Sequence, residues 1–263
     1  MRKVVSAIVA ATFMAASAPA YADMAEAQQA YANGDFTRAV ELWQDEASAG
    51  DADAAWYVGN MFVDGLGVGD PDPELATTYY QMAIDQDHVE AMVSLGLLFA
   101  QGRGVRQNYH RAMNLLYQAA LEEHPVAMVE IANYFLDGVP NYVEKSEGHA
   151  FEWYGLAARQ GVVLAQLRFG QMHYLGIGAP QDQEEGLMWI AVAREVALSR
   201  DEPYWSYRVY PLDDAIRGAE GDEPHTLRSS VIALYDEYVA EVSPEVANDA
   251  QQAALAWIAD RAN

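Results

Sequence analysis

A pattern of small and aromatic residues returns four times along the chain, every 36 to 38 residues. Two positions within this pattern recur with the same period. One position holds Gly59, Gly96, Ala132 and Gly170, and the other holds Ala76, Ala112, Ala150 and Gly186. A fixed period of this length indicates units that cannot bury their apolar faces alone and stack on their neighbours. The chain is therefore predicted to fold as an array of repeats.

Each repeat is predicted to form two helices joined by a glycine turn. In the second repeat, Leu95 and Phe99 share one helical face, and the segment Gly102-Arg103-Gly104-Val105 follows them. Glycine accepts the left-handed conformation that ends a helix. Small residues at the repeated positions let neighbouring helices approach closely, and large aromatic side chains fill the remaining volume.

Two of the repeats depart from the pattern. The third repeat has Gly138-Val139-Pro140 in place of the Gly-x-Gly turn, and its linking loop is longer. In the fourth repeat His173 takes the position of an aromatic residue, and we expect it to be a packed histidine whose ring nitrogen is satisfied by a neighbouring residue. The aromatic residues at that position in the other repeats are Phe62, Phe99 and Phe135.

The repeats at 51–198 are predicted to lie between two capping regions. Residues 23–50 form a shorter hairpin around Asn33-Gly34-Asp35. Residues 199–263 hold an irregular aromatic segment and two closing helices, the second opened by Ser243-Pro244-Glu245, an N-cap residue followed by proline. The aromatic segment is either a packing plug or an accessory binding loop. Its aromatic residues are Tyr204, Trp205, Tyr207 and Tyr210.

The first 22 residues have the pattern of a signal peptide. Arg2 and Lys3 precede an apolar stretch at 4–18, and Ala20-Tyr21-Ala22 supplies small residues for cleavage. We expect cleavage after Ala22 and export to the periplasm or the medium. An N-terminal membrane anchor is the alternative, although the apolar stretch is short for a membrane span.

Composition excludes some classes of partner. The formal net charge is −24, and Lys145 is the only lysine after Lys3. Such a charge repels phosphate backbones and anionic lipids. It serves either solubility or the recognition of a basic partner protein. The chain also has no cysteine, so it forms no disulfide framework.

No residue pattern predicts catalysis, a cofactor or a metal. The glycines at 65–69 follow a helix rather than the strand that a dinucleotide loop requires. The six histidines form no zinc-binding pair on one helix, and His88 and His124 are interpreted as loop or cap residues. The acidic run at 70–74 lacks the spacing of a calcium loop and is interpreted as the start of a helix.

The repeat pattern resembles the Sel1-like repeats, relatives of the tetratricopeptide repeats. The residues that carry this resemblance in the second repeat are Leu95-Gly96, Phe99, Gly102-x-Gly104-Val105, Ala112, Tyr117 and Ala119-Ala120. The resemblance implies an all-α fold, an α-solenoid of stacked αα-hairpin repeats that forms a right-handed superhelix. It also implies that the first helices line a concave surface for peptides or partner proteins.

We therefore expect a non-enzymatic interaction module, an adaptor or regulator at the bacterial cell envelope. Helical spacing selects the first-helix positions that point away from the core as its partner-binding residues. These residues are Tyr57, Asn60, Asp64, Ser94, Leu97, Gln101, Glu130, Asn133 and Asp137. One alternative is a cell-wall or β-lactam hydrolase, as suggested for cysteine-rich relatives. Another is a negative regulator of an envelope sensor kinase.

Overall fold

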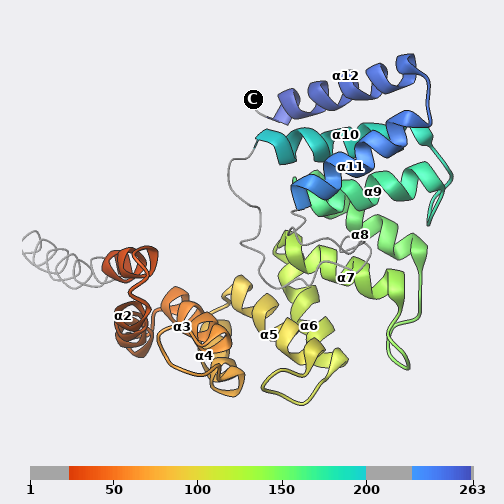
Figure 1. Cartoon of the computed structure of the whole chain (residues 1–263). Coiled ribbons are helices and arrows are strands. Elements are labelled where there is room, and N and C mark those ends of the chain that lie inside the picture. The colour runs from red at the N-terminus through yellow and green to blue at the C-terminus, as the bar shows by residue number, and fades with distance from the viewer. Residues whose placement is uncertain (1–23, 200–226, 262–263) are drawn as a thin grey trace, which may run out of the picture. The chain divides into compact units, whose positions relative to one another are not determined.

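The computed structural model describes residues 24–199 and 227–261, and helices dominate these two ranges (Figure 1). Residues 24–32 are helical. The helices that follow are α2 (Phe36–Ala49), α3 (Ala52–Asp64), α4 (Pro73–Ile84), α5 (Val89–Gln101), α6 (Tyr109–Leu121), α7 (Pro125–Asp137), α8 (Glu147–Arg159), α9 (Val163–Leu175), α10 (Gln183–Ser199), α11 (Leu227–Ala240) and α12 (Pro244–Arg261). The described ranges hold no strand beyond an isolated antiparallel bridge between Val139 and Val143.

The predicted all-α solenoid of helical hairpins is confirmed. The four pairs are α3 with α4, α5 with α6, α7 with α8, and α9 with α10. The first helices of the four pairs begin at equivalent positions of the repeat, and so do the second helices. The repeated alanines of both helices are fully buried. On the first helices these are Ala54, Ala91, Ala127 and Ala165, and on the second helices they are Ala76, Ala112 and Ala150. Small side chains therefore mark the helix crossings.

Local sequence sets the helix ends. Asp51 and Asp72 cap the starts of α3 and α4 by accepting the backbone N–H groups of Ala54 and Leu75. Gly65, Gly102 and Gly176 end α3, α5 and α9 in the left-handed conformation, with φ of 70°, 68° and 73°. The predicted glycine turns and the acidic helix start at Asp72 are thus confirmed.

The third repeat ends its first helix differently. Gly138 has φ 75° and ψ 157°, outside the left-handed helical region, so the chain leaves α7 in an extended direction. The N–H of Tyr142 donates to the carbonyl of Val139 over 2.9 Å, and Asn141 takes a φ of 62° at the third position of this turn. The longer loop that the sequence predicts is therefore a small hairpin-like turn.

The chain divides into two compact units, and the boundary lies within α6, after Ala119. In the first unit, residues 24–32 and helices α2 to α5 share one apolar core. Trp43, Met61 and Tyr80 are its largest fully buried side chains. Each helix packs on the next in sequence, from α2 through α5.

The second unit continues the same arrangement and adds the closing helices. Helices α7 to α10 pack in sequence, and α10 also contacts α11 and α12 (Figure 1). Tyr174, Leu187 and Ala250 bring α9, α10 and α12 together in an apolar cluster. Ser243 caps α12 by accepting the N–H of Val246, as its sequence predicts.

Two predicted segments lie outside the described residues. These are the signal peptide at 1–22 and the aromatic residues at 204–210. Across the helices that the structure describes, none combines the length and the apolar character that crossing a membrane requires.

Candidate interaction face

We define the first-helix face as the repeat positions equivalent to Tyr57, Asn60 and Asp64 on α3. The nine predicted partner-binding residues occupy this face on α3, α5 and α7, and their exposure differs. Asp64, Gln101 and Asp137 are exposed; Tyr57, Asn60, Ser94 and Asn133 are half-buried; Leu97 and Glu130 are buried. The third position of each trio is therefore the open edge of the face.

The prediction that all nine residues point away from the core is wrong for Leu97 and Glu130. Their exposed fractions are 3% and 7%. Helical spacing identifies which residues share a side of a helix. It does not reveal what other parts of the chain cover that side. Leu97 and Glu130 are consequently packing positions on the first-helix face.

The two asparagines of the face bind to their own repeats. Asn60 accepts a hydrogen bond of 2.7 Å from the Tyr80 hydroxyl, which joins α3 to α4. Asn133 accepts the corresponding bond from the Tyr154 hydroxyl, which joins α7 to α8. A hydroxyl buried without a partner would destabilise the fold, so each amide satisfies a buried tyrosine. Both amides therefore contribute to helix pairing.

Glu130 extends this network in the third repeat. Asn133 donates from Nδ2 to the Glu130 carboxyl oxygen Oε1 over 3.3 Å. Burial raises the pKa of Glu130 to about 8, while the bond from Asn133 acts in the opposite direction. At neutral pH the carboxyl group is thus mostly protonated and can donate a hydrogen bond.

A row of aromatic rings crosses the first unit beside Tyr57. The rings of Trp43 and Tyr57 stack with centroids 4.6 Å apart, and the ring of Trp56 lies 4.9 Å from Tyr57 at an interplanar angle of 51°. Trp56 also stacks on the His88 ring at 5.6 Å. The repeat pattern identifies Tyr57 in this row but not the other rings, because Trp43 belongs to a different helix and Trp56 to a neighbouring helical position.

His88 holds one end of the row in place. Its Nδ1 accepts the backbone N–H of Ala91 over 3.1 Å, so its Nε2 carries the proton in the neutral ring and donates to Asp53 over 3.0 Å. The interpretation of His88 as a cap residue is confirmed. Asp53 and Glu90 are exposed beside the ring. The aromatic row therefore has an acidic border.

Trp56 and Ser94 connect the row to the next repeat. The indole Nε1 of Trp56 donates to the Ser94 hydroxyl over 3.1 Å, and that hydroxyl donates to the carbonyl of Glu90 over 2.9 Å. Ser94 is one of the predicted partner-binding residues. Its hydrogen bonds fix the orientation of the Trp56 ring, which packs against Tyr57.

In the second unit the first-helix face continues onto α9. Arg168, Gln171 and Leu175 occupy the positions equivalent to Glu130, Asn133 and Asp137. The predicted site stopped at the third repeat and missed them. The repeat period alone would have found these residues, since each lies 38 residues after its counterpart.

The predicted packing of His173 among aromatic rings is confirmed, but the prediction that a neighbour satisfies it is wrong for Nδ1, which is buried without a hydrogen-bond partner among the described residues. The imidazole meets the rings of Phe151 and Phe169 edge-on, with centroids 4.8 and 4.6 Å away. Burial lowers the pKa of His173, so the neutral ring is favoured. Within residues 24–199 and 227–261, no three His, Cys, Asp or Glu side chains are grouped so that they could hold a metal ion.

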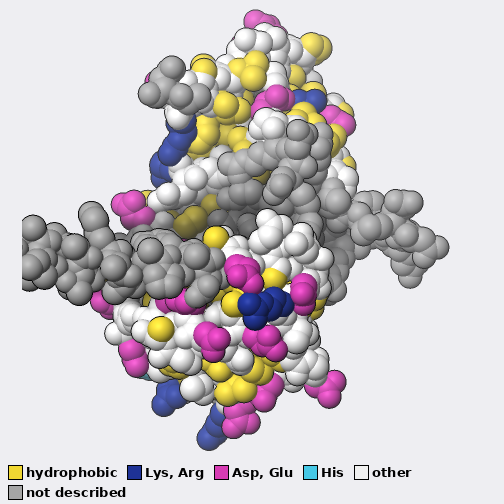
Figure 2. Space-filling view, turned by 90° about the vertical axis from the view of Figure 1, so that its left-hand side faces the viewer, with side chains coloured by type: hydrophobic (Ala, Val, Ile, Leu, Met, Phe, Trp, Pro, Cys, Tyr) yellow, Lys and Arg dark blue, Asp and Glu magenta, His cyan; other side chains and the backbone are white. Residues whose placement is uncertain are grey.

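The surface carries the acidic character of the composition. On the face shown in Figure 2, Asp and Glu side chains are spread over many places and Lys and Arg side chains gather in a few. A surface of this sign attracts basic groups, and salt screens the attraction.

Comparison with known proteins agrees with the helical repeats. The family described as "Sel1 repeat" matches residues 52–88, 89–124, 125–162 and 163–193. The crystal structure of a Sel1 repeat protein from Oxalobacter formigenes superposes with a TM-score of 0.57 and 23% identity, covering 78% of this chain and 80% of that one. This likeness concerns the fold.

Two curated relatives are named as regulators. The exopolysaccharide production negative regulator of Rhizobium leguminosarum bv. viciae is 26% identical over 64% of this chain and 53% of its own length. The chitin synthase regulator SKT5 of Saccharomyces cerevisiae is 29% identical over 52% of this chain and 20% of its own length. The chain thus spans about half or less of these relatives.

Proteins built from Sel1 repeats are protein-interaction modules. The four matched segments cover more than half of the chain; the first three each contain one helical hairpin, and the fourth contains α9 and the larger part of α10. The chain therefore belongs to the Sel1 repeat family.

Proposed function

We propose that this chain is a non-enzymatic interaction module, an adaptor or regulator at the bacterial cell envelope. It acts in the periplasm or outside the cell and binds a peptide or partner protein on its first-helix face. The regulatory names of its relatives and the interaction role of Sel1 repeats support this assignment.

The aromatic row of the first unit is the observation that carries the proposal. Tyr57 is half-buried, and its ring packs against those of Trp43 and Trp56. Preorganised aromatic side chains with a polar tip are typical of binding surfaces. Asp53 and Glu90 are exposed next to them. This combination suits a partner segment that brings a basic side chain over an aromatic ring.

The exposed edge of the face gives places to test binding without disturbing the fold. Asp64 ends α3 and Gln101 ends α5, and both side chains are exposed. Thr78 on α4 and Gln118 on α6 are equally exposed but lie on second helices. The two pairs of positions therefore compare the first-helix face with the second helices in the same unit.

A photo-reactive amino acid at each of these four positions tests the proposal in cells that produce the full chain. We expect irradiation to yield a discrete cross-linked product from positions 64 and 101 and none from positions 78 and 118. Mass spectrometry then identifies the trapped protein. Equal products from all four positions, or none from any, would count against binding on the first-helix face.

The proposed location depends on whether residues 1–22 act as a signal peptide. If residues 1–22 are a signal peptide, the chain recovered from the periplasm or medium begins at Asp23. Mass spectrometry of the intact exported protein measures this. A chain that retains Met1 in the cytoplasm would rule out the proposed location.

A further inference from the structure

The acidic border of the aromatic row consists of Asp53 on α3 and Glu90 on α5, and the His88 ring lies close to both carboxylates. Its Nε2 is 3.0 Å from Oδ1 of Asp53, and its Nδ1 is 3.4 Å from Oε2 of Glu90. The side chain of His88 is 8% exposed, whereas those of Asp53 and Glu90 are 71% and 52% exposed. A buried ring therefore contacts two carboxylates that face solvent.

In the neutral ring these two contacts differ in kind. Nδ1 accepts the backbone N–H of Ala91 and so caps α5, and it has no proton to give to Glu90. The single ring proton is on Nε2 and is donated to Asp53. Neutral His88 adds no positive charge, so both carboxylates keep their full attraction for a cation from outside.

Protonation changes the role of Nδ1. An imidazolium ring carries a proton on both nitrogens and has no acceptor left. Nδ1 then cannot accept the N–H of Ala91, and the Glu90 carboxylate at 3.4 Å is the acceptor next to it. Protonated His88 thus exchanges a helix cap for an ion pair with Glu90 and keeps its bond to Asp53. Histidine is the side chain whose charge ordinarily changes between about pH 5 and 8.

The chain around His88 is acidic on the elements that meet there. Besides Asp53 on α3 and Glu90 on α5, the turn before His88 holds Asp85 and Asp87, both exposed. These charges favour a cation at this position, either the ring itself or a basic group of another molecule.

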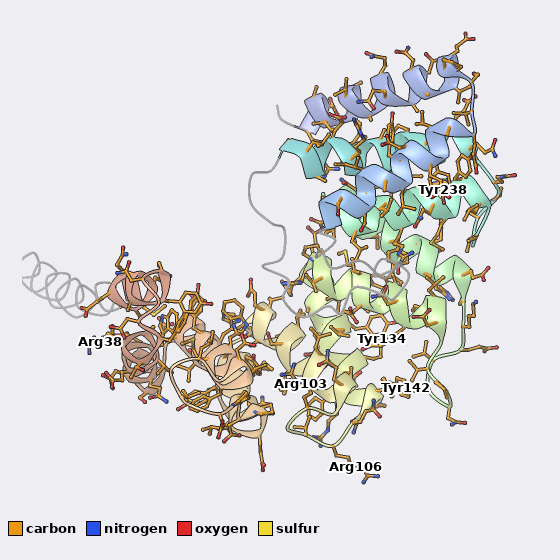
Figure 3. All side chains as sticks on the ribbon, in the orientation of Figure 1. Arg38, Arg103, Arg106, Tyr134, Tyr142 and Tyr238 are labelled. Carbon is orange, nitrogen blue, oxygen red and sulfur yellow. The ribbon has the colours of Figure 1, made fainter. Side chains whose placement is uncertain are left out.

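Two arginines of the first unit that Figure 3 labels, Arg38 and Arg103, make their contacts elsewhere. Arg38 lies 2.9 Å from the carboxylate of Glu26, and Arg103 donates to the carbonyl of Val63 over 3.5 Å. Burial raises the pKa of Tyr57, so this phenol stays neutral over the range in which a histidine titrates. His88 is therefore the group whose change of charge acts on the acidic border.

We propose that His88 is a pH switch of the partner-binding site: when protonated it occupies Asp53 and Glu90, and a lysine or arginine side chain of the partner then binds there more weakly. The two cations compete for the same carboxylates, so acid releases the partner and neutral pH favours binding. The stacking of Trp56 on His88 places this switch next to the aromatic row. The inference deepens the proposed function and rests on it.

Nuclear magnetic resonance of the full chain tests the switch without any partner. We expect the amide proton of Ala91 to move upfield along the titration curve of the His88 ring, and its temperature coefficient to change to that of an amide without a hydrogen bond. In a His88→Asn variant the amide should stay bonded at every pH, because asparagine caps a helix and does not titrate. An Ala91 amide that remains hydrogen-bonded when His88 is protonated would overturn the proposal.

A blocked Gly-Gly-Lys-Gly-Gly peptide tests the competition, with the indole Nε1–H resonance of Trp56 as the reporter of binding. We expect its dissociation constant to be at least about threefold higher at pH 5.5 than at pH 7.5. The difference should disappear in His88→Asn and persist in His110→Asn, a control at an exposed histidine of α6. A second control peptide carries glutamine in place of lysine and should not bind.

Three results would show that the proposal is wrong. They are equal affinity of the lysine peptide at the two pH values, the same pH dependence in the His88→Asn variant, and no binding at either pH. Cross-linking at positions 64 and 101 tests the interaction role separately, so failure of the switch is distinguishable from failure of the proposed function.

Discussion

At the scale of single residues, the helix crossing at Gly170 leaves no room for a side chain. A Cβ atom there would lie 2.7 Å from Cγ1 of Ile190 and 2.8 Å from the carbonyl oxygen of Gly186. At Gly96 the nearest atoms, in Ala112 and Leu116, would be 3.3 Å away. A methyl group at this repeat position therefore overlaps its neighbours in the fourth repeat and crowds them much less in the second, and Ala132 occupies the position in the third.

We predict that Gly170→Ala lowers the free energy of unfolding by about 2 kcal/mol, because a backbone carbonyl cannot move aside as a side chain can. Gly96→Ala should change it by less than about 1 kcal/mol, since the better helix propensity of alanine offsets a small displacement. Denaturant unfolding followed at each unit measures both values. An equal loss in the two variants would contradict this account of the crossings.

Glu130 makes the stability of the second unit depend on pH. Its pKa rises from 4.5 to about 8 on folding, so between these values the folded chain binds more protons than the unfolded chain. The contribution of Glu130 is fully present below pH 4.5 and is lost as the pH rises towards 8. Ionisation of this buried carboxyl group therefore destabilises the fold on the alkaline side.

We predict that Glu130→Gln raises the free energy of unfolding at pH 8.5 by about 2 kcal/mol relative to the unchanged chain. At pH 4 the two proteins should unfold alike, because the amide can accept the bond from Asn133 as the neutral acid does. Thermal unfolding across this pH range measures the difference. A difference that is constant with pH would show that Glu130 keeps its charge in the fold.

At the scale of helices, the pairing of Asn60 with Tyr80 explains how α3 and α4 are joined. Tyr80 is 2% exposed, so its hydroxyl needs partners inside the protein. In the second repeat the corresponding positions hold Leu97 and Leu116, and both side chains are buried. Polar and apolar pairs are thus two solutions to one contact, provided that both members change together.

We predict that Asn60→Leu and Tyr80→Leu couple favourably in a double-mutant cycle. Each single change leaves one member of the pair without the other, whereas the double variant reproduces the apolar pair of the second repeat. The coupling should be about 1 kcal/mol. Asn60→Leu combined with Leu75→Ala, at an exposed position of α4, is the additive control. Additivity in both cycles would show that the hydrogen bond contributes no pairing energy.

At the scale of the whole molecule, the net charge of −24 opposes compactness. Like charges repel at low ionic strength, and salt screens this repulsion over a Debye length of about 10 Å at 0.1 M. We predict that the melting temperature rises by several degrees as NaCl increases from about 10 to 200 mM, and then levels off. A neutral osmolyte at equal osmolality is the control. A melting temperature that falls with salt would mean that attractive ion pairs dominate.

The helix ends could be predicted from the sequence because their causes are local. Asp72 caps α4 with the backbone of Leu75, and Gly65 and Gly102 end their helices through their own φ angles. The open edge of the face at Asp64 is exposed, as its helical position suggests. The burial of Leu97 and Glu130 was missed, because it depends on parts of the chain beyond their own helices.

The sequence by itself determined the repeat array: a period of 36 to 38 residues, small residues at the crossings and glycine turns all act over short distances along the chain. Only the tertiary structure decided which amides face Tyr80 and Tyr154. It also decided that the ring of Trp43 packs against Tyr57. These contacts join residues that are far apart in sequence, and their energies depend on geometry that no local pattern encodes.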